Sequence, residues 1–435
     1  MKASLYNILV NAPDGSVVLY TTRTGGMTRF NADERSLIER ALCGGTSHQP
    51  EIDQVMLSQG HLVEDDFDEE ASVRMKRKIG IVDKNRLDIV LLPTLDCNFR
   101  CVYCYEEHRK EYMSDEVAKK IIKLFEAEIP SAKLALLHWF GGEPLLTPNI
   151  VAEITSQAFQ IAKRAGVKLV PQMTTNGYLL HGDQLRNLLD VGILDYQITI
   201  DGNRDSHNKM RVASNGVGTY DVIVNNCRTL LENPKTSLTF RINFNHQNIE
   251  SVSDVLDEFL PKTRKRIRLV LEPIFGDDNV SATANLDPEY ISTFLDSIYA
   301  RSVQMGYGSS AADVNFIPEK LVYCYAERER QFIIGPSGDV FKCAAMDFKH
   351  ENRLGELTDK GTVAWDDKFK DWMDQGESFK PVCDRCVYLP LCMGGCRSAQ
   401  FANDGETCSL IATNASRILQ MISRRNLEEK IAAVK

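Results

Sequence analysis

Features that would place this chain in a membrane, on a nucleic acid or outside the cell are missing from its sequence. No stretch approaches the about 18 consecutive apolar residues of a membrane span. The amino end, MKASLYNILVNAPDG, interrupts its short apolar run with Asn, Pro, Asp and Gly, unlike a secretory signal. Lys and Arg number 51 against 60 Asp and Glu, and a net charge of −9 repels a phosphate backbone. We therefore expect a cytoplasmic protein that binds neither membrane nor nucleic acid.

Cysteine is abundant instead. The chain of 435 residues has 43% hydrophobic and 26% charged residues, which suits a globular protein of two or three domains. In a reducing cytosol, clustered cysteines are more often metal sites than disulfides. Ten of the 12 cysteines fall into two groups: Cys97, Cys101 and Cys104, then Cys324, Cys343, Cys383, Cys386, Cys392, Cys396 and Cys408. Cys43 and Cys227 stand apart, and we expect them to be packing residues.

The sequence divides into three regions, which we place at 1–88, 89–310 and 311–435. The first has strand-like runs at 6–10, 17–20 and 27–29, a helix after Asn31 and another over 51–59. The acidic run 64–70 and the basic run 74–78 are typical of a solvated connector. The third region is loop-rich and carries seven cysteines before a final helix at about 410–434, so metal ligation is its expected source of stability.

The second region alternates strands with amphipathic helices. Repeated β/α units predict a parallel sheet covered by helices, and six units form a partial, TIM-like barrel, short of the full eight. The six predicted strands cover residues 87–92, 133–140, 167–174, 195–200, 237–243 and 267–273. The five predicted helices cover residues 114–128, 150–165, 183–191, 219–231 and 249–259.

Unusual polar residues follow these strands. They are the first cysteine group, Gly141-Gly142-Glu143-Pro144, Thr175-Asn176-Gly177, Asp201-Gly202, Asn243 with Asn245, and Glu272. Because α/β barrels build their sites at the carboxyl ends of their strands, one shared pocket is expected.

The first cysteine group, Cys97-x3-Cys101-x2-Cys104, supplies three thiolates within eight residues. A cubane [4Fe–4S] cluster has four irons, so three protein ligands leave one iron open to an outside molecule. The alternative is a structural zinc site with His108 as the fourth ligand.

The segment CNFRCVYCYE resembles the CxxxCxxC signature of radical S-adenosylmethionine (radical SAM) enzymes, including the aromatic Tyr103 before the last cysteine. Gly141 to Pro144 is similar to that family's GGEP motif, in which the backbone and Glu143 bind the amino group of SAM. The resemblance implies a [4Fe–4S] cluster that chelates SAM and cleaves it to a 5′-deoxyadenosyl radical. It also implies SAM and substrate contacts at polar positions, namely Thr175, Asn176, Asp201, Arg211 and Arg241. Asp201 and Glu272 are both candidates for a general base.

The seven later cysteines resemble the SPASM domain, which holds two auxiliary [4Fe–4S] clusters in many peptide-modifying radical SAM enzymes. By that resemblance Cys324, Cys343 and Cys396 ligate the first auxiliary cluster. Cys383, Cys386, Cys392 and Cys408 ligate the second, which makes three clusters in all. Sulfatase-maturating relatives carry a further ligand six residues after the first, where this chain has Arg330. The sequence therefore does not identify the fourth ligand of the first auxiliary cluster. The candidates are water, Cys43 or Cys227, another side chain and the substrate. A zinc ribbon is the alternative for this region.

Auxiliary clusters beside a radical generator favour net oxidation of the substrate, since they can carry an electron away. The first region resembles the winged-helix-like recognition element of enzymes that mature ribosomally made peptides, which adds the leader peptide to a sheet edge. We therefore expect a peptide maturase that oxidatively forms a carbon–carbon or thioether cross-link in a precursor peptide with a leader, with flavodoxin or ferredoxin as electron donor. The alternatives are a sulfatase-type maturase that makes formylglycine, an electron-transfer protein without catalysis, and a first region that only braces the barrel.

Overall fold

The computed structural model describes residues 1–435 except 13–14, 275–287, 309–320, 375–378, 380 and 398–435. The chain forms two compact units, each built from segments distant in sequence. One unit contains residues 1–83, 312–329 and 372–435, and the other contains 84–311 and 330–371. The predicted final helix and Cys408 lie outside the described residues.

The second unit is built on a parallel sheet that confirms all six predicted strands. These are β6 (Arg86–Leu91), β8 (Leu134–Trp139), β9 (Lys168–Thr175), β10 (Asp195–Thr199), β12 (Ser237–Phe244) and β13 (Ile267–Pro273). They neighbour one another in chain order, each parallel to the next. Their carboxyl ends therefore meet along one edge, which is the arrangement that a shared site requires.

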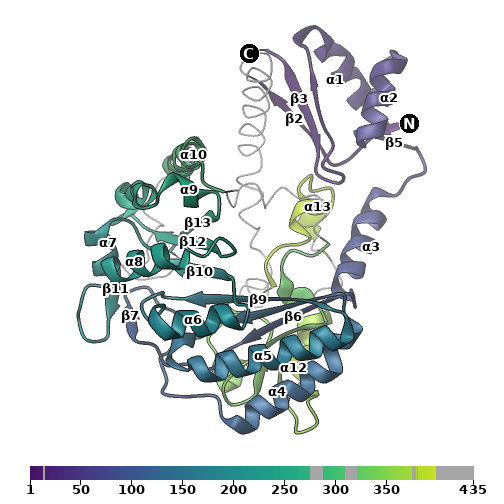
Figure 1. Ribbon diagram of the computed structural model, residues 1–435. Coiled ribbons are helices and arrows are strands. Elements are labelled where there is room, and N and C mark those ends of the chain that lie inside the picture. The colour runs from purple at the N-terminus through teal and green to yellow at the C-terminus, as the bar shows by residue number, and fades with distance from the viewer. Residues whose placement is uncertain (13–14, 275–287, 309–320, 375–378, 380, 398–435) are drawn as a thin grey trace. The chain divides into compact units, whose positions relative to one another are not determined.

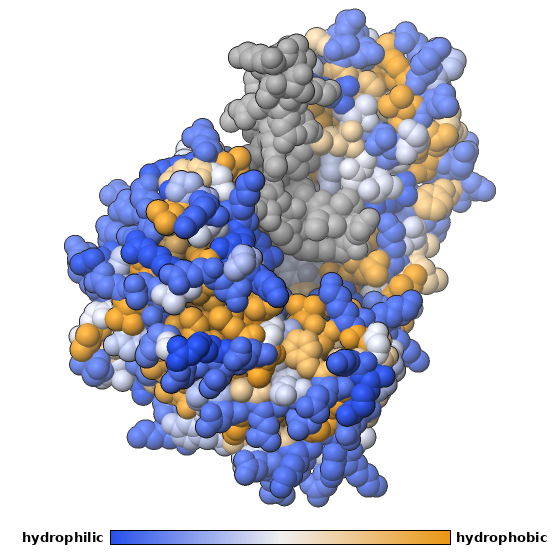
Figure 2. All heavy atoms as spheres, in the orientation of Figure 1, coloured by the Kyte–Doolittle hydropathy of each residue, from blue (hydrophilic) through white to orange (hydrophobic). Residues whose placement is uncertain are grey.

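Helices cover this sheet, and Figure 1 shows α4, α5 and α6 together on one side of it. The helices between the strands are α4 (Asp115–Glu128), α5 (Pro148–Ala165), α6 (Gly182–Asp190), α7 (Arg204–Met210) and α8 (Tyr220–Leu230), followed by α9 (Pro261–Arg264) and α10 (Pro288–Gln304). Ser114 begins α4 by accepting a hydrogen bond from the Val117 N–H, and Ile121 and Phe125, one turn apart, are buried. Figure 2 shows hydrophilic surface over much of this unit. The stretch predicted as a helix over 249–259 is a 3-10 helix, Ile249–Glu258.

The sheet continues past the barrel, which the sequence did not predict. β14 (Gln331–Ile334) pairs parallel with β6, and β15 (Asp339–Phe341), β16 (Gly355–Leu357) and β17 (Val363–Trp365) follow antiparallel. The region predicted to be loop-rich therefore contains four strands within residues 331–365.

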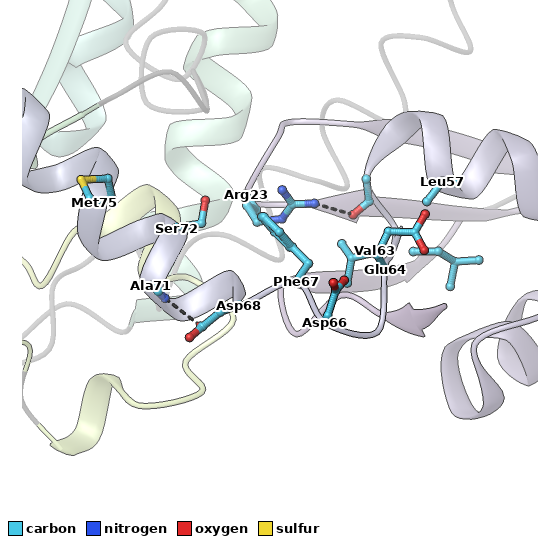
Figure 3. Close-up of a pocket in the computed structure, with 12 residues that line it drawn as sticks. Arg23, Leu57, Val63, Glu64, Asp66, Phe67, Asp68, Ala71, Ser72 and Met75 are labelled. Carbon is cyan, nitrogen blue, oxygen red and sulfur yellow. Dashed lines mark hydrogen bonds between the residues drawn. The ribbon is translucent and has the colours of Figure 1, made fainter.

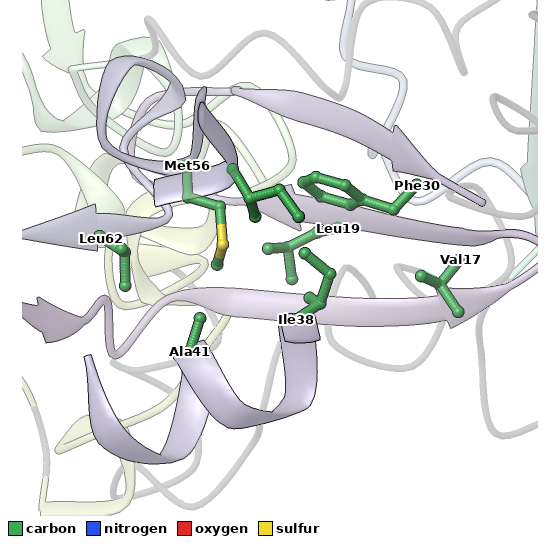
Figure 4. Close-up of a cluster of buried hydrophobic side chains, with 8 residues drawn as sticks. Val17, Leu19, Phe30, Ile38, Ala41, Met56 and Leu62 are labelled. Carbon is green, nitrogen blue, oxygen red and sulfur yellow. The ribbon is translucent and has the colours of Figure 1, made fainter. Parts of the chain in front are cut away.

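The other unit begins with the predicted strands and helices. β2 (Asn7–Asn11), β3 (Val17–Thr21) and β4 (Met27–Phe30) form an antiparallel sheet, while β1 (Lys2–Ala3) pairs with β5 (Leu62–Val63). Helices α1 (Arg35–Gly44) and α2 (Pro50–Gln59) pack on the sheet. Their shared core consists of Val17, Leu19, Phe30, Ile38, Ala41, Ile52, Met56 and Leu62 (Figure 4).

The predicted connector is in fact a helix, α3 (Glu69–Ile81), in which Glu69, Val73 and Arg77 are buried. Its charges are paired internally: Arg23 Nε lies 3.0 Å from Glu69 Oε1, and Arg77 Nη2 lies 2.9 Å from Glu327 Oε2. Because buried opposite charges satisfy each other, a charged segment here is structural.

Candidate active site

The first cysteine group lies in the loop after β6, where strand pairing and hydrogen bonds with neighbouring residues hold it. Cys101 is in a short strand, β7 (Phe99–Cys101), which pairs antiparallel with β11 (Arg211–Ala213) so that Cys101 faces Arg211. The Cys97 N–H donates to Asp96 Oδ1 at 2.9 Å. Cys97 and Cys101 are half-buried and Cys104 is exposed.

Burial keeps these thiols protonated. It raises the pKa of Cys97 to about 12, with the Glu143 charge adding to the effect, and the pKa of Cys104 to about 11. Thiolates would therefore form here on binding a metal, which supplies the compensating positive charge.

Three thiols from one loop match the donor set of a cubane that leaves one of its four irons open. A cubane takes one thiolate at each iron, so its ligands stand apart around it. The zinc alternative uses His108 as the fourth ligand, and His108 Nε2 lies 3.6 Å from Cys104 Sγ.

The glycine loop after β8 packs directly against the cysteine loop. The Gly142 N–H donates to the Thr94 carbonyl at 3.2 Å, and the Glu143 N–H donates to the Asp96 carbonyl at 2.8 Å. A Cβ on Gly142 would lie 2.1 Å from the Asp96 oxygen, which no side chain tolerates. Gly142 is therefore required for close contact between two protein loops.

Glu143 is buried, with 1% of its surface exposed. Its Oε1 accepts from the Leu145 N–H at 3.0 Å and from Thr175 Oγ1 at 2.7 Å, and its Oε2 accepts from the Asn176 N–H at 2.8 Å. Burial raises the pKa of this carboxyl, and the Asn176 hydrogen bond opposes the rise. Since each carboxylate oxygen accepts two hydrogen bonds, Oε2 keeps one position for a further donor such as an ammonium group.

Asn176 connects this loop to the cysteines. Its Nδ2 donates to Asn98 Oδ1 at 2.7 Å and lies 4.0 Å from Cys97 Sγ. Asn98 was not among the predicted site residues, because an asparagine between two cysteines has no signal of its own. Pro144 is buried in the short 3-10 helix Pro144–Leu146 that follows Glu143.

Tyr103 links the cysteine loop to the far strands of the barrel. Its hydroxyl donates to Asp201 Oδ2 and accepts from Arg211 Nη1 at 2.7 Å and from Asn243 Nδ2 at 3.1 Å. The Asn243 N–H donates to Asp201 Oδ1 at 2.9 Å, and Arg241 Nε donates to Asn243 Oδ1 at 2.9 Å. These residues come from the ends of β7, β10, β11 and β12, so the network ties four segments together.

The carboxyl group of Asp201 is enclosed in that network, and none of its surface is exposed. Burial raises its pKa while the Arg211 charge lowers it. A carboxylate with these partners and no exposure is placed to hold Tyr103 and Arg211. Glu272 lies beside Asn243 in the strand register of β12 and β13.

The predicted site residues of the barrel thus gather at one edge of the sheet. Burial raises the pKa of both Cys97 and Glu143, and the Arg211 charge opposes the rise at both groups. His207, which the sequence did not indicate, also contacts Asp201: the Asp201 N–H donates to its Nδ1 at 3.3 Å.

The later cysteines fall in different units. Cys324, Cys383, Cys386, Cys392 and Cys396 belong to the unit that contains the N-terminal strands, whereas Cys343 belongs to the barrel unit. Cys383 and Cys386 pack with Tyr6, Val73 and Leu389.

Arg330, Cys227 and Cys43 can also be placed in the fold. Arg330 donates to Glu128 Oε2 at 2.9 Å and to the Glu128 carbonyl at 2.6 Å, so it forms part of the barrel unit. Cys227 is fully buried in α8, as predicted. Cys43 is exposed on α1, so its prediction as a packing residue is wrong.

Comparisons with known proteins agree with this geometry. Residues 91–259 match the Radical SAM superfamily. The chain is 27% identical over 345 residues to Fe-coproporphyrin III synthase of Methanosarcina barkeri, covering 70% of this chain and 81% of that protein. It is 21% identical over 329 residues to a cysteine-type anaerobic sulfatase-maturating enzyme of Clostridium novyi (69% and 85%) and 21% identical over 349 residues to the PqqA peptide cyclase of Bradyrhizobium diazoefficiens (74% and 84%).

Solved structures share the fold. The structure of anSMEcpe with bound AdoMet and Cp18Cys peptide aligns with a TM-score of 0.62 at 19% identity, covering 80% of this chain and 100% of that one. SuiB of Streptococcus suis bound to S-adenosylmethionine aligns with a TM-score of 0.54 at 14% identity, covering 94% of this chain and 99% of that one. In the part of the chain that is described, no helix is long and apolar enough to cross a membrane. The chain carries a radical SAM domain and is related by sequence to sulfatase-maturating enzymes and peptide cyclases.

Proposed function

We propose that this enzyme matures a ribosomally made precursor peptide, oxidatively joining two of its residues through a carbon–carbon or thioether bond. The observation that carries the proposal is the N-terminal module, residues 1–83, which precedes the radical SAM domain and has its own sheet and core. The fold likeness to SuiB extends over 94% of this chain, against 80% for anSMEcpe. SuiB has a structure bound to precursor peptide SuiA, and one of the sequence relatives is a peptide cyclase.

The site residues of the barrel would have different roles in this reaction. Cys97, Cys101 and Cys104 would hold a [4Fe–4S] cluster that, with SAM bound, supplies a 5′-deoxyadenosyl radical for hydrogen abstraction. Glu143 orients SAM through the remaining acceptor position on Oε2. Tyr103 and Asp201 hold the cysteine loop against β10 and β12, and Asp201 acts as a positioning residue.

The later cysteines would hold two auxiliary [4Fe–4S] clusters. We assign Cys324, Cys343 and Cys396 to the first and Cys383, Cys386, Cys392 and Cys408 to the second. Because the substrate loses electrons overall, these centres would carry the second electron away from it. A flavodoxin or ferredoxin would donate the electron that SAM cleavage requires.

The module at 1–83 would bind the leader peptide. Its sheet has two edge strands, β2 and β4, and each edge offers unpaired backbone groups to an incoming strand. Backbone pairing gives affinity with little sequence preference, so a second feature is needed for specificity.

A sulfatase-type maturase is the second candidate, because such enzymes are among both the sequence relatives and the fold neighbours. The two candidates predict different products. A cross-link joins two residues of one peptide and lacks an aldehyde, whereas formylglycine reacts with a hydrazine probe.

The deciding experiment is anaerobic reconstitution with iron and sulfide, followed by iron counting, a SAM-cleavage assay and incubation with precursor peptides encoded beside the gene. We expect about 12 irons per chain, 5′-deoxyadenosine, and a peptide that loses two hydrogens and resists the hydrazine probe. A chain that binds zinc tightly and leaves SAM intact would overturn the proposal.

A further inference from the structure

A pocket of about 670 Å³ opens on the N-terminal module, between the end of α2 and the start of α3 (Figure 3). Its floor is apolar and consists of Leu57, Leu62, Val63, Phe67, Ala71 and Met75. All of these residues lie within the first 83 residues, so the pocket belongs to a single unit. Its volume lies within the range of small-ligand sites, which is enough for one or two large apolar side chains.

Apolar surface continues from the pocket along α3. Met75, Ile79 and Val82 are 60%, 52% and 48% exposed, although they are all hydrophobic. Met75 and Ile79 lie four residues apart on one face of α3, and Val82 is the residue that caps its C-terminal end. Figure 2 shows hydrophobic patches among the hydrophilic surface of the module. An exposed apolar stripe that joins an apolar pocket is typical of a surface that binds another chain.

The rim of the pocket is negative. Glu64, Asp66 and Asp68 line it and are exposed. The cation in the wall, Arg23, lies 3.0 Å from the buried Glu69 and stacks over the Phe67 ring at 5.1 Å, so its charge is neutralised within the protein.

Three of the four basic residues of α3 contact other groups of the protein. Lys76 Nζ donates to the Arg23 carbonyl at 3.2 Å, and Arg77 pairs with Glu327. Arg74 lies 3.6 Å from Asp384. The pocket therefore combines an apolar lining with exposed carboxylates at its mouth.

We propose that this pocket reads the precursor peptide by taking up an apolar side chain, aromatic or aliphatic, that is flanked by Lys or Arg. This inference rests on the proposed function and adds to it a determinant of specificity distinct from strand pairing at the sheet edge. The apolar side chain is buried on the floor, and the flanking cations meet Glu64, Asp66 and Asp68 at the rim.

Fluorescence anisotropy of the full reconstituted chain tests the chemistry directly. The probe is the fluorescein-labelled peptide Gly-Lys-Leu-Phe-Lys-Gly, compared with Gly-Glu-Leu-Phe-Glu-Gly, which keeps the apolar pair, and Gly-Lys-Ser-Ser-Lys-Gly, which keeps the charges. We expect the first to bind at least about 10-fold more tightly than either control, with the advantage over the acidic peptide shrinking at high salt. Equal binding of the three peptides would overturn the proposal.

Variants then locate the binding surface. Met75→Asp places a charge at the exposed junction of pocket and stripe, and we expect it to weaken binding of the first peptide by about 10-fold or more. The matched control is Val55→Asp, which makes the same change at a residue of α2 that is 41% exposed and does not line the pocket. If both variants bind as the unaltered chain does, or weaken equally, the assigned surface is wrong.

The same preparations separate this inference from the proposed function. A Met75→Asp chain should still cleave SAM and hold its iron, while its apparent KM for a full precursor rises and kcat changes little. Precursor cross-linking that is indifferent to Met75→Asp would refute the pocket and leave the maturase intact. Absence of any precursor modification by the unaltered chain would refute both.

Discussion

The substitution Glu327→Gln tests how the N-terminal module is fixed to the cysteine-rich end of the chain. The side chains of Glu327, Arg77 and Arg397 are 0%, 4% and 3% exposed. Arg77 Nη2 lies 2.9 Å and Arg397 Nη2 lies 3.7 Å from Glu327 Oε2, and the Tyr323 N–H donates to Glu327 Oε1 at 2.9 Å. Burial and then the Arg77 charge lower the pKa of Arg397 to about 10, so the two cations already repel each other.

Glutamine keeps the shape of the side chain but removes the charge between two buried cations. Breaking a buried ion pair in this way costs about 3–5 kcal/mol, because the remaining charge stays buried without compensation. The effect should be local to this unit. Native-state hydrogen exchange by mass spectrometry should therefore show faster exchange in α3 and around Glu327, with little change in the strands of the barrel unit.

The matched control is Glu258→Gln, which removes a carboxylate that lies 2.6 Å from Arg228. The Arg228 side chain is 53% exposed and the Glu258 side chain is 29% exposed. Exposed pairs contribute about 0–1 kcal/mol, so this variant should exchange nearly as the unaltered chain does. If Glu327→Gln shifts exchange no more than Glu258→Gln, then apolar contacts alone hold α3 in place and the ion cluster contributes nothing.

Three further changes probe the site and the module. Cys97→Ala should abolish 5′-deoxyadenosine formation while about eight irons remain. Cys43→Ser, at an exposed cysteine outside the first cysteine group, should leave SAM cleavage unchanged. Formation of 5′-deoxyadenosine by the Cys97→Ala chain would contradict the assignment. Glu143→Gln should lower the free energy of unfolding by about 1–3 kcal/mol, because the new amide NH₂ would face N–H and O–H groups that now donate to the carboxylate. The same change should raise the KM for SAM. Unchanged thermal stability and an unchanged KM would contradict the proposed hydrogen-bond network. His61 is buried, which lowers its pKa to about 4 from 6.5, so the folded state keeps it neutral. Because the unfolded chain binds the proton more readily, the free energy of unfolding should fall by about 1.4 kcal/mol per pH unit as the pH drops from 6.5 toward 4. Denaturant melts at several pH values should show a smaller slope for His61→Gln than for the unaltered chain. An equal slope in both chains would refute this role of His61.

The strands of the barrel could be predicted because their signal is local. Each is a short, largely apolar run bounded by turn residues, and a parallel sheet buries such runs whatever lies far away in sequence. The burial of α3 has no such local signal. Its pairing of Arg77 with Glu327 spans 250 residues, so a segment rich in charges was interpreted as a solvated connector. β14 was missed for the same reason, since four residues become a strand only by pairing with β6.

The site shows the same division between local and distant information. The cysteine spacing and the glycine loop are contiguous motifs, and they correctly indicated the radical SAM domain that residues 91–259 match. The role of Asp201 depended on burial and on partners from three other segments, which the sequence does not display. It was therefore considered as a base, while the structure encloses it with Tyr103, Arg211 and Asn243.

The location of α3 decides how the peptide-binding proposal can be tested at all. Val73 of α3 and Tyr6 of the N-terminal segment pack with Cys383 and Cys386, and Thr22 donates to the Val387 carbonyl at 2.5 Å. Deleting the module would strip these contacts from two predicted cluster ligands, so loss of the peptide reaction after deletion would not distinguish peptide binding from cluster support. Single changes on the exposed surface, such as that at Met75, leave those contacts in place. They alone can show whether residues 1–83 recognise a peptide or only brace the cysteine-rich segment.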